Sequence, residues 1–130
     1  MIGVDSNVLV RYIMQDEPAQ SRLAARFVDR LTREEPGFVS AVALAETSWV
    51  LDAVYKATRT ELARAMEVLL SADTLVVEHS ASAYRAIEAL RAGADFADAF
   101  IAAIDRHAGC VETVTFDKNA AKRAGMRLLR

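Results

Sequence analysis

Two aspartates directly follow apolar runs of the kind that form strands in a parallel sheet. Asp5 comes after residues 1–4, and Asp117 comes after residues 113–116. Ligands bind at the carboxyl ends of the strands in an open parallel sheet, so we expect both aspartates at one edge of the sheet. Two carboxylates at one edge repel each other unless a cation lies between them. The spacing therefore predicts a cation site that includes Asp5 and Asp117.

Two further acids, Glu46 and Asp98, lie within helical patterns among apolar neighbours. The residues at i−4, i+3 and i+4 are Val42, Trp49 and Val50 for Glu46, and Ala94, Ile101 and Ala102 for Asp98. Residues at these spacings share a helix face, so both acids are predicted to face inward. A buried carboxylate without a partner costs several kcal/mol. Each acid therefore needs a cation, a raised pKa or a basic partner from another element.

Each acid alone also fits a simpler structural role. Asp5 and Asp117 would each serve as the N-cap of a following helix, and Glu46 would meet a buried arginine. Asp95 shares a helix face with Asp98 at i, i+3 near a helix N-terminus, which suits a cap as well as a ligand. Four acids placed by separate arguments at strand ends or on inward faces nevertheless favour one common site.

Carboxylate oxygens select hard divalent cations. Mg²⁺ and Mn²⁺ prefer oxygen ligands, whereas the sequence offers no histidine pair or cysteine set for zinc. His79 in a loop and His107 near a helix end favour exposure or capping. A carboxylate-bound ion lowers the pKa of a water that becomes the nucleophile, and a second ion would stabilise the leaving oxygen. The acids thus predict metal-dependent phosphodiester hydrolysis without a protein nucleophile.

The elements expected to position these acids alternate between short strands and longer helices. Apolar runs predict strands at residues 1–4, 38–40, 75–77, 112–116 and 127–129. Helical spacing predicts helices beginning near residues 6, 60 and 80, and spanning residues 19–34, 41–55, 95–107 and 118–124. The alternation indicates an α/β fold of three layers, in which helices cover both faces of a central, mainly parallel sheet of four to five short strands.

Length, composition and charge narrow the class of protein. The 130 residues suit a single domain over residues 1–130, and 53% hydrophobic with 26% charged residues is typical of a compact soluble chain. A net charge of −2 argues against nucleic-acid binding through bulk positive charge. Cations held by clustered carboxylates would reverse that balance locally.

The cysteine content and the apolar segments of the sequence bear on where the protein is located in the cell. Cys110 is the only cysteine, so no internal disulfide is expected. Asp5 and Arg11 interrupt the N-terminal apolar residues, unlike a signal peptide, and no run of about 20 apolar residues exists to span a bilayer. We therefore expect a cytoplasmic protein with no membrane contact.

Four segments resemble, in order and spacing, the acidic motifs of PIN domains. They are residues 4–9 (VDSNVL), 45–49 (AETSW), 93–102 (GADFADAFIA) and 115–117 (TFD). The chain looks most like the VapC toxins of bacterial toxin–antitoxin pairs, and the resemblance spans nearly its whole length. It implies a PIN-like fold with a Mg²⁺ or Mn²⁺ site. The metal-binding acids implied are Asp5, Glu46, Asp98 and Asp117, with Asp95 as an auxiliary acid and Ser6, Asn7 and Thr115 hydrogen-bonding metal water or carboxylates.

The resemblance also implies partners. The substrate would be RNA, such as a transfer RNA or a ribosomal RNA loop, and a homodimer would be neutralised by a small cognate antitoxin. Four basic residues near the motifs would hold RNA phosphates beside the metal, or would only form solvated helix faces: Arg11, Lys118, Lys122 and Arg123. The apolar helix around residues 62–70 would form a partner surface or, on the simpler interpretation, ordinary core.

Other functions fit parts of the pattern. A housekeeping RNA-processing or DNA-flap nuclease would use the same acids and metal. A receiver-like signalling module would need paired acids near the first strand and an acceptor aspartate after the third, where Glu78 and His79 stand instead. A phosphatase of the haloacid dehalogenase class would need Asp-x-Asp after the first strand, where Asp5 is followed by Ser6 and Asn7. A non-catalytic metal-binding module is the remaining alternative.

Overall fold

The computed structural model describes residues 1–130 and contains seven helices and five short strands. In chain order the strands are β1 (Ile2–Gly3), β2 (Gly37–Val39), β3 (Leu75–Val77), β4 (Val114–Thr115) and β5 (Arg127–Leu128). The helices are α1 (Ser6–Met14), α2 (Pro18–Arg30), α3 (Ala41–Ala53), α4 (Arg59–Ser71), α5 (Ser80–Arg91), α6 (Phe96–His107) and α7 (Lys118–Arg123). The α/β class and the order of elements predicted from the sequence are confirmed.

The strands are parallel, as predicted, but they form two sheets. β1, β2 and β3 make a three-stranded sheet in that order, with Gly3 opposite Phe38 and Phe38 opposite Val76. β4 and β5 pair with each other in a separate two-stranded sheet. The five strands therefore match the predicted number, while the single central sheet is divided between the two halves of the chain.

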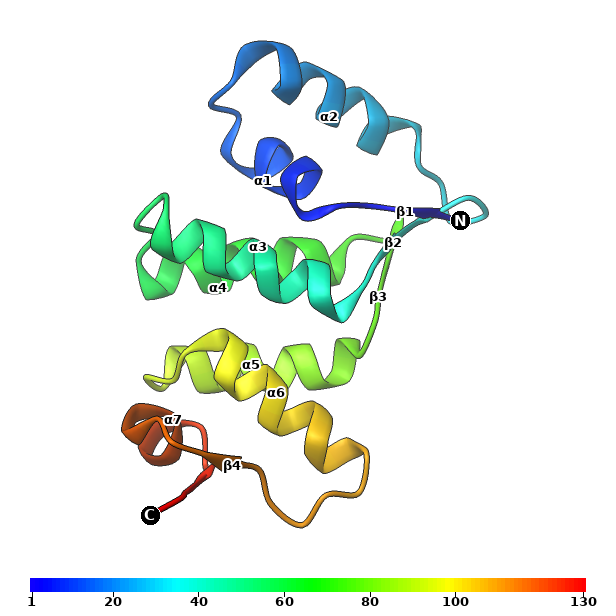
Figure 1. The fold of residues 1–130 in the computed structure, drawn as a ribbon. Helices are drawn as coiled ribbons and strands as arrows, with labels where there is room; N and C mark the ends of the chain where they lie inside the picture. Colours follow the sequence, from blue (N-terminus) through cyan, green and yellow to red (C-terminus); the bar gives the residue numbers. More distant parts are fainter.

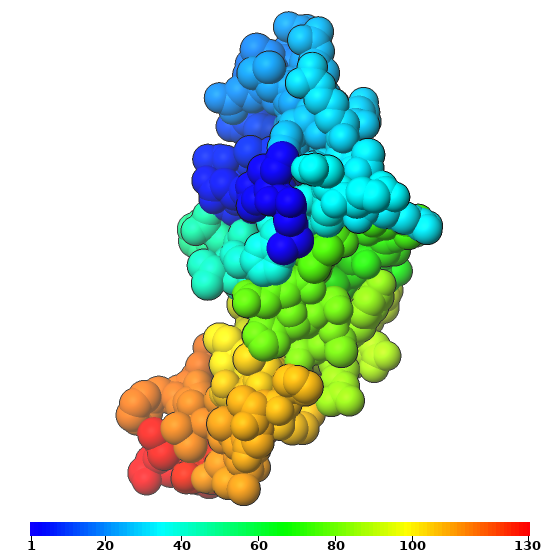
Figure 2. Space-filling view, turned by 90° about the vertical axis from the view of Figure 1, so that its right-hand side faces the viewer, coloured from blue at the N-terminus to red at the C-terminus, as the bar shows by residue number.

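The helices stack in pairs along the molecule. Figure 1 shows α1 with α2, then α3 with α4, then α5 with α6, all on the same side of β1–β3, followed by α7 and β4 at the far end. Figure 2 shows the same progression on the surface, from the N-terminal elements at one end to the C-terminal elements at the other. The molecule is therefore elongated, and β1 and β4 lie in different parts of it.

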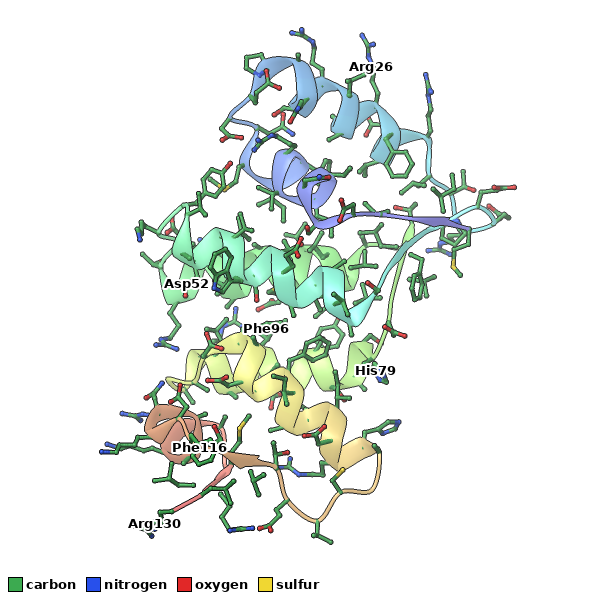
Figure 3. The ribbon with its side chains drawn as sticks, viewed as in Figure 1. Arg26, Asp52, His79, Phe96, Phe116 and Arg130 are labelled. Atoms are coloured by element: carbon green, nitrogen blue, oxygen red, sulfur yellow. The ribbon has the colours of Figure 1, made fainter.

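One hydrophobic core holds the first six helices and the three-stranded sheet together. Its 18 buried residues run from Val4 in the first strand segment to Phe100 in α6. Phe96 and Phe100 are almost fully buried and their rings lie 5.5 Å apart; Figure 3 shows Phe96 where α6 faces α3 and α4. This packing directs the chain after β3 onto α3 and α4, which explains why β4 does not reach β1.

A second, small cluster attaches the C-terminal unit to α6. Ala102 on α6 packs with Ala120 on α7 and with Met126, which precedes β5. Only three buried residues make this contact, compared with 18 in the main core. The unit formed by β4, α7 and β5 is thus held mainly through one face of α6.

Helix ends follow the local sequence signals. Thr58 and Glu61 form a capping box at the start of α4, and Ser40 caps α3 through the Ala43 N–H. Gly93, between α5 and α6, has a φ of +119°, a backbone conformation that favours glycine. The boundaries consequently agree with the predicted ones to within a few residues.

None of the helices combines the length and the apolar character that crossing a membrane would require.

Candidate functional site

The first acidic group joins the start of α1 to the middle of α3. Asp5 is the N-cap of α1, and its Oδ1 accepts a hydrogen bond from the Ser6 N–H at 2.8 Å. Ser6 is buried, and its hydroxyl donates to the carboxylate of Glu46. Asp5 and Glu46 line one side of a cavity of about 310 Å³ that opens beside β1 and β2. Asp5 and Glu46 therefore face one hollow, with Ser6 as their link.

The face of α3 that carries Glu46 points outward, which corrects the sequence-based expectation. Glu46 is exposed, and its neighbours Val42 and Trp49 are 76% and 62% exposed. The buried face instead includes Leu44 and Leu51. Apolar residues occur on all sides of this helix, so their spacing did not identify the inward face. Glu46 thus needs no buried basic partner and is accessible to solvent.

The second acidic group lies where α6 meets α7. Asp95 is the N-cap of α6 and accepts from the Asp98 N–H through Oδ2 at 3.0 Å. Asp117 is the N-cap of α7, and its Oδ1 accepts from two backbone N–H groups of that helix at 2.7 and 3.0 Å. The hydroxyl of Thr115 accepts from the Asp117 N–H at 3.0 Å. The carboxylates of Asp95 and Asp117 are thus held in place by hydrogen bonds from the first residues of the helices that they cap.

Asp98 carries the clearest electrostatic signal of this group. Asp98 is half-buried. Its neighbours Ala94 and Ala102 are buried, whereas Ile101 is 49% exposed, so the side chain lies at the border between the inward and outward faces of α6. Burial raises the pKa of Asp98, and the negative charges of Asp95 and Asp117 raise it further. The ion pairs of the protein all involve other acids, so no lysine or arginine neutralises this group.

The raised pKa of Asp98 predicts how stability depends on pH in the absence of divalent metal. Between the ordinary value of 3.8 and the raised pKa, the folded chain holds a proton that the unfolded chain has released. The folded state then binds more protons, so its free energy of unfolding should fall as pH rises through this window and stay lower above it. Urea unfolding in EDTA across this range would measure the effect.

Asp98→Asn provides the matched comparison for that measurement. The variant has no carboxyl group to titrate at this position, so the part of the pH dependence that comes from Asp98 should be missing. Parallel stability curves for the two proteins would contradict the assignment of the raised pKa to Asp98.

The structure brings the predicted acids together in two groups. Asp5 lies near Glu46, whereas Asp98 lies near Asp95 and Asp117. No set of three or more potential ligands is arranged to hold a metal ion. The expected meeting of Asp5 and Asp117 required one sheet, and the strands that precede them belong to different sheets. Convergence of all four acids on one ion therefore stays a prediction.

The donor chemistry nevertheless suits a hard divalent cation. Every group in question is a carboxylate, and their mutual repulsion at Asp98 is of the kind that a bound cation relieves. The polar residues expected near the metal divide in the same way, because Ser6 contacts Glu46 and Thr115 contacts Asp117. Asn7 is exposed and lines a separate hollow beside β1.

The basic residues near the motifs differ in exposure and in whether other side chains of the protein bind them. Lys118, Lys122 and Arg123 are exposed on α7, where Arg123 lies 3.5 Å from the space a side chain at Gly93 would occupy. Arg11 is instead bound to side chains of its own surroundings, namely those of Tyr55, Gln20 and Asp16. The exposed cations accordingly lie beside Asp117, on the same short helix that this aspartate caps.

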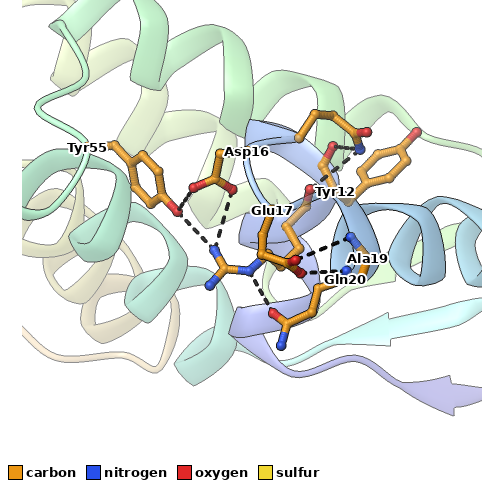
Figure 4. A network of polar contacts seen from close by, with 8 residues as sticks. Tyr12, Asp16, Glu17, Ala19, Gln20 and Tyr55 are labelled. Atoms are coloured by element: carbon orange, nitrogen blue, oxygen red, sulfur yellow. Dashed lines mark hydrogen bonds and ion pairs between the residues drawn. The ribbon is translucent and has the colours of Figure 1, made fainter.

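Arg11 belongs to a polar network that the sequence did not reveal (Figure 4). Its guanidinium donates to the Tyr55 hydroxyl at 2.9 Å and to the Gln20 side chain at 2.8 Å, and it lies 3.5 Å from the Asp16 carboxylate. The Tyr55 hydroxyl in turn donates to Asp16, which lowers the pKa of that carboxyl. The network joins α1 and α2 to the segment just after α3, so Arg11 helps to hold these elements together.

Comparison with known proteins gives one clear result. The family described as PIN domain matches residues 2–126, which is nearly the whole chain, while no curated protein gives a match. PIN domains are generally metal-dependent nucleases that use divalent metal ions. This agrees with the carboxylate chemistry at the starts of α1, α6 and α7 and on α3. The chain belongs to the PIN domain family.

Proposed function

We propose that the protein is a Mg²⁺- or Mn²⁺-dependent endoribonuclease that acts as the toxin of a toxin–antitoxin pair. The observation that carries the proposal is the group of carboxylates around Asp98, which lacks a basic partner and raises the pKa of that residue. An uncompensated acidic group on the framework of a PIN domain is suited to a metal-dependent nuclease.

Each acidic residue has a distinct part in this proposal. Asp5, Glu46, Asp98 and Asp117 would hold the metal, which supplies an activated water for attack on phosphorus. The Ser6 hydroxyl would orient the Glu46 carboxylate, and the Thr115 hydroxyl would orient Asp117 by accepting a hydrogen bond from the backbone N–H of Asp117. Asp95 would add negative charge and position the start of α6, and Asn7 would hydrogen-bond to water at the site.

The substrate of the proposed reaction is RNA. The exposed cations Lys118, Lys122 and Arg123 would bind phosphates next to Asp117, as a local group of positive charges on a chain whose net charge is −2. Arg11 is a weaker candidate because its guanidinium is committed to Tyr55, Gln20 and Asp16. A cognate antitoxin, a homodimer and a cytoplasmic site of action complete the proposal.

Metal removal gives the direct test. Purified protein should cleave single-stranded or loop RNA with Mn²⁺ or Mg²⁺ present, lose that activity in EDTA, and regain it when the metal is restored. Isothermal titration should detect Mn²⁺ binding to the wild type and weaker binding to Asp98→Asn. Cleavage that persists in EDTA, or an absence of Mn²⁺ affinity, would count against the proposal.

Asp29→Asn is the matched control for the titration. Asp29 is an exposed acid on α2 and belongs to neither acidic group. The variant changes the net charge of the chain by the same amount as Asp98→Asn. Equal loss of Mn²⁺ binding in both variants would point to nonspecific attraction by overall charge.

A further inference from the structure

Two strands have open edges that point away from their own sheets. β1 is bonded only to β2, through the N–H groups of Ile2 and Val4, so the backbone groups of Gly3 face the open side. β4 is bonded only to β5, whose N–H groups donate to the carbonyls of Thr113 and Thr115, so those of Val114 face outward. Unpaired strand edges are templates for pairing with another strand.

An apolar hollow lies against the open edge of β1. It has a volume of about 600 Å³ and lies between β1, α1 and α2. Its walls include the apolar side chains of Ile2, Val8, Leu23 and Phe27, and Leu23 is 64% exposed. Gly3 has no atom within 4 Å of the position that a Cβ would take, so the edge is sterically accessible. The hollow therefore suits a strand that carries apolar side chains.

The C-terminal unit offers a strand of that kind. Val114 on β4 is 47% exposed and Phe116, just after it, is 81% exposed. Figure 3 shows Phe116 at the end of the molecule occupied by α7, away from the helices of the main core. An aromatic side chain left in water at the end of an edge strand is an unfavourable arrangement that docking would relieve.

The chain's own β4 is not positioned to fill the hollow. α1, α2 and β1 lie at one end of the molecule, and β4 and α7 lie at the other (Figure 1). Carrying β4 across to β1 of the same chain would move the C-terminal unit off α6, which would break the packing of Ala102 against Ala120 and Met126. A second copy of the chain can supply β4 without that loss.

We propose that two copies of this chain exchange their C-terminal units, so that β4 of each copy pairs in parallel with β1 of the other. The dimer then contains two five-stranded parallel sheets, each in the order β3-β2-β1-β4-β5. In each sheet β1–β3 come from one copy, and β4 and β5 come from the other. The reciprocal contact is closed by two-fold symmetry, which limits the assembly to a dimer.

The exchange, together with the proposed function, makes each metal site a product of two chains. Parallel pairing of β1 with β4 sets Asp5 of one copy beside Asp117 of the second copy at the same sheet edge. Glu46 accompanies Asp5, and Asp98 accompanies Asp117, so each chain contributes one acidic group. The site is incomplete in a single copy, which accounts for the two separate groups in this structure.

Light scattering and disulfide trapping test the exchange without an activity assay. The wild type should have twice the 14.2 kDa mass of one chain. A register that sets Asp5 level with Asp117 also sets Ile2 level with Val114. In a Cys110→Ser background, an Ile2→Cys chain mixed with a Val114→Cys chain should therefore form a disulfide-linked pair on oxidation. A monomeric mass, or an intrachain disulfide in the Ile2→Cys/Val114→Cys double variant, would overturn the proposal.

Two controls keep the trapping result specific. Val68 is 54% exposed on α4, far from the edge of β1 in sequence and outside the hollow. Ile2→Cys mixed with Val68→Cys should give no linked pair. Leu23→Glu should produce a folded monomer, since it places a charge in the hollow, whereas Val68→Glu should stay dimeric; a dimeric Leu23→Glu protein would contradict docking at this hollow.

Mixing inactive variants tests the shared site. Asp5→Asn and Asp117→Asn chains should each be inactive alone, and after unfolding and refolding together they should recover about a quarter of wild-type activity, because half of the pairs then carry one intact site. No recovery would overturn the shared site. If the wild type itself cleaves no RNA, the proposed function fails, while mass and disulfide trapping still decide the exchange.

Discussion

Asp98→Asn is expected to reduce kcat/KM for RNA cleavage by at least about a hundredfold, since losing even an indirect support of a metal ligand costs ten- to a hundredfold. The same change should raise the free energy of unfolding of the metal-free protein. It removes a charge whose pKa is raised by burial and by the neighbouring acids Asp95 and Asp117. Loss of activity combined with a gain of stability is the signature of a residue that is held for function.

The control for this experiment is again Asp29→Asn, which should retain wild-type activity. Expression in cells extends the test, because the wild type should arrest growth and Asp98→Asn should not. An active Asp98→Asn enzyme would exclude Asp98 as a metal ligand. Active wild-type protein that leaves growth unaffected would favour a housekeeping nuclease instead of a toxin.

Phe100→Ala is expected to lower the free energy of unfolding by about 3–5 kcal/mol, the usual cost of truncating a buried phenylalanine. Phe100 is 2% exposed and packs against Phe96 in the main core. Domains of this size are stable by only about 5–15 kcal/mol, so a large share of the total would be lost. Urea unfolding at fixed protein concentration would measure the change.

Val111→Ala is the control for that measurement, because Val111 is fully exposed. Its effect should stay within about 0.5 kcal/mol. A similarly small effect of Phe100→Ala would show that α6 does not pack against α3 and α4 as described. Phe100 lies two residues after Asp98 on the same helix, so the variant should also weaken Mn²⁺ binding.

Local signals in the sequence predicted the elements well. The third strand was predicted at residues 75–77 and lies there, and helix ends followed caps such as Asp95 and glycines such as Gly93. These features depend on a few neighbouring residues, so the sequence contains them directly. The division of the strands into two sheets depends instead on packing between distant segments, which no local pattern records.

The candidate site was predictable to a similar degree. The acidic residues were identified by type and spacing, and the structure divides them into one pair and one group of three that the sequence order did not specify. The outward face of α3 escaped prediction because Val42 and Trp49 resemble core residues. The contacts of Tyr55 with Asp16 and Arg11 join residues about 40 positions apart, so spacing could not reveal them.

The aspartates that begin helices have a consequence for how tightly an ion would bind. Asp5 and Asp117 each accept hydrogen bonds from the backbone through Oδ1, and Asp95 accepts one through Oδ2. One oxygen of each carboxylate is therefore immobilised by the helix, while the other is free and already oriented. Folding itself restricts the rotation of these side chains, so a cation arriving later has little rotational entropy left to remove.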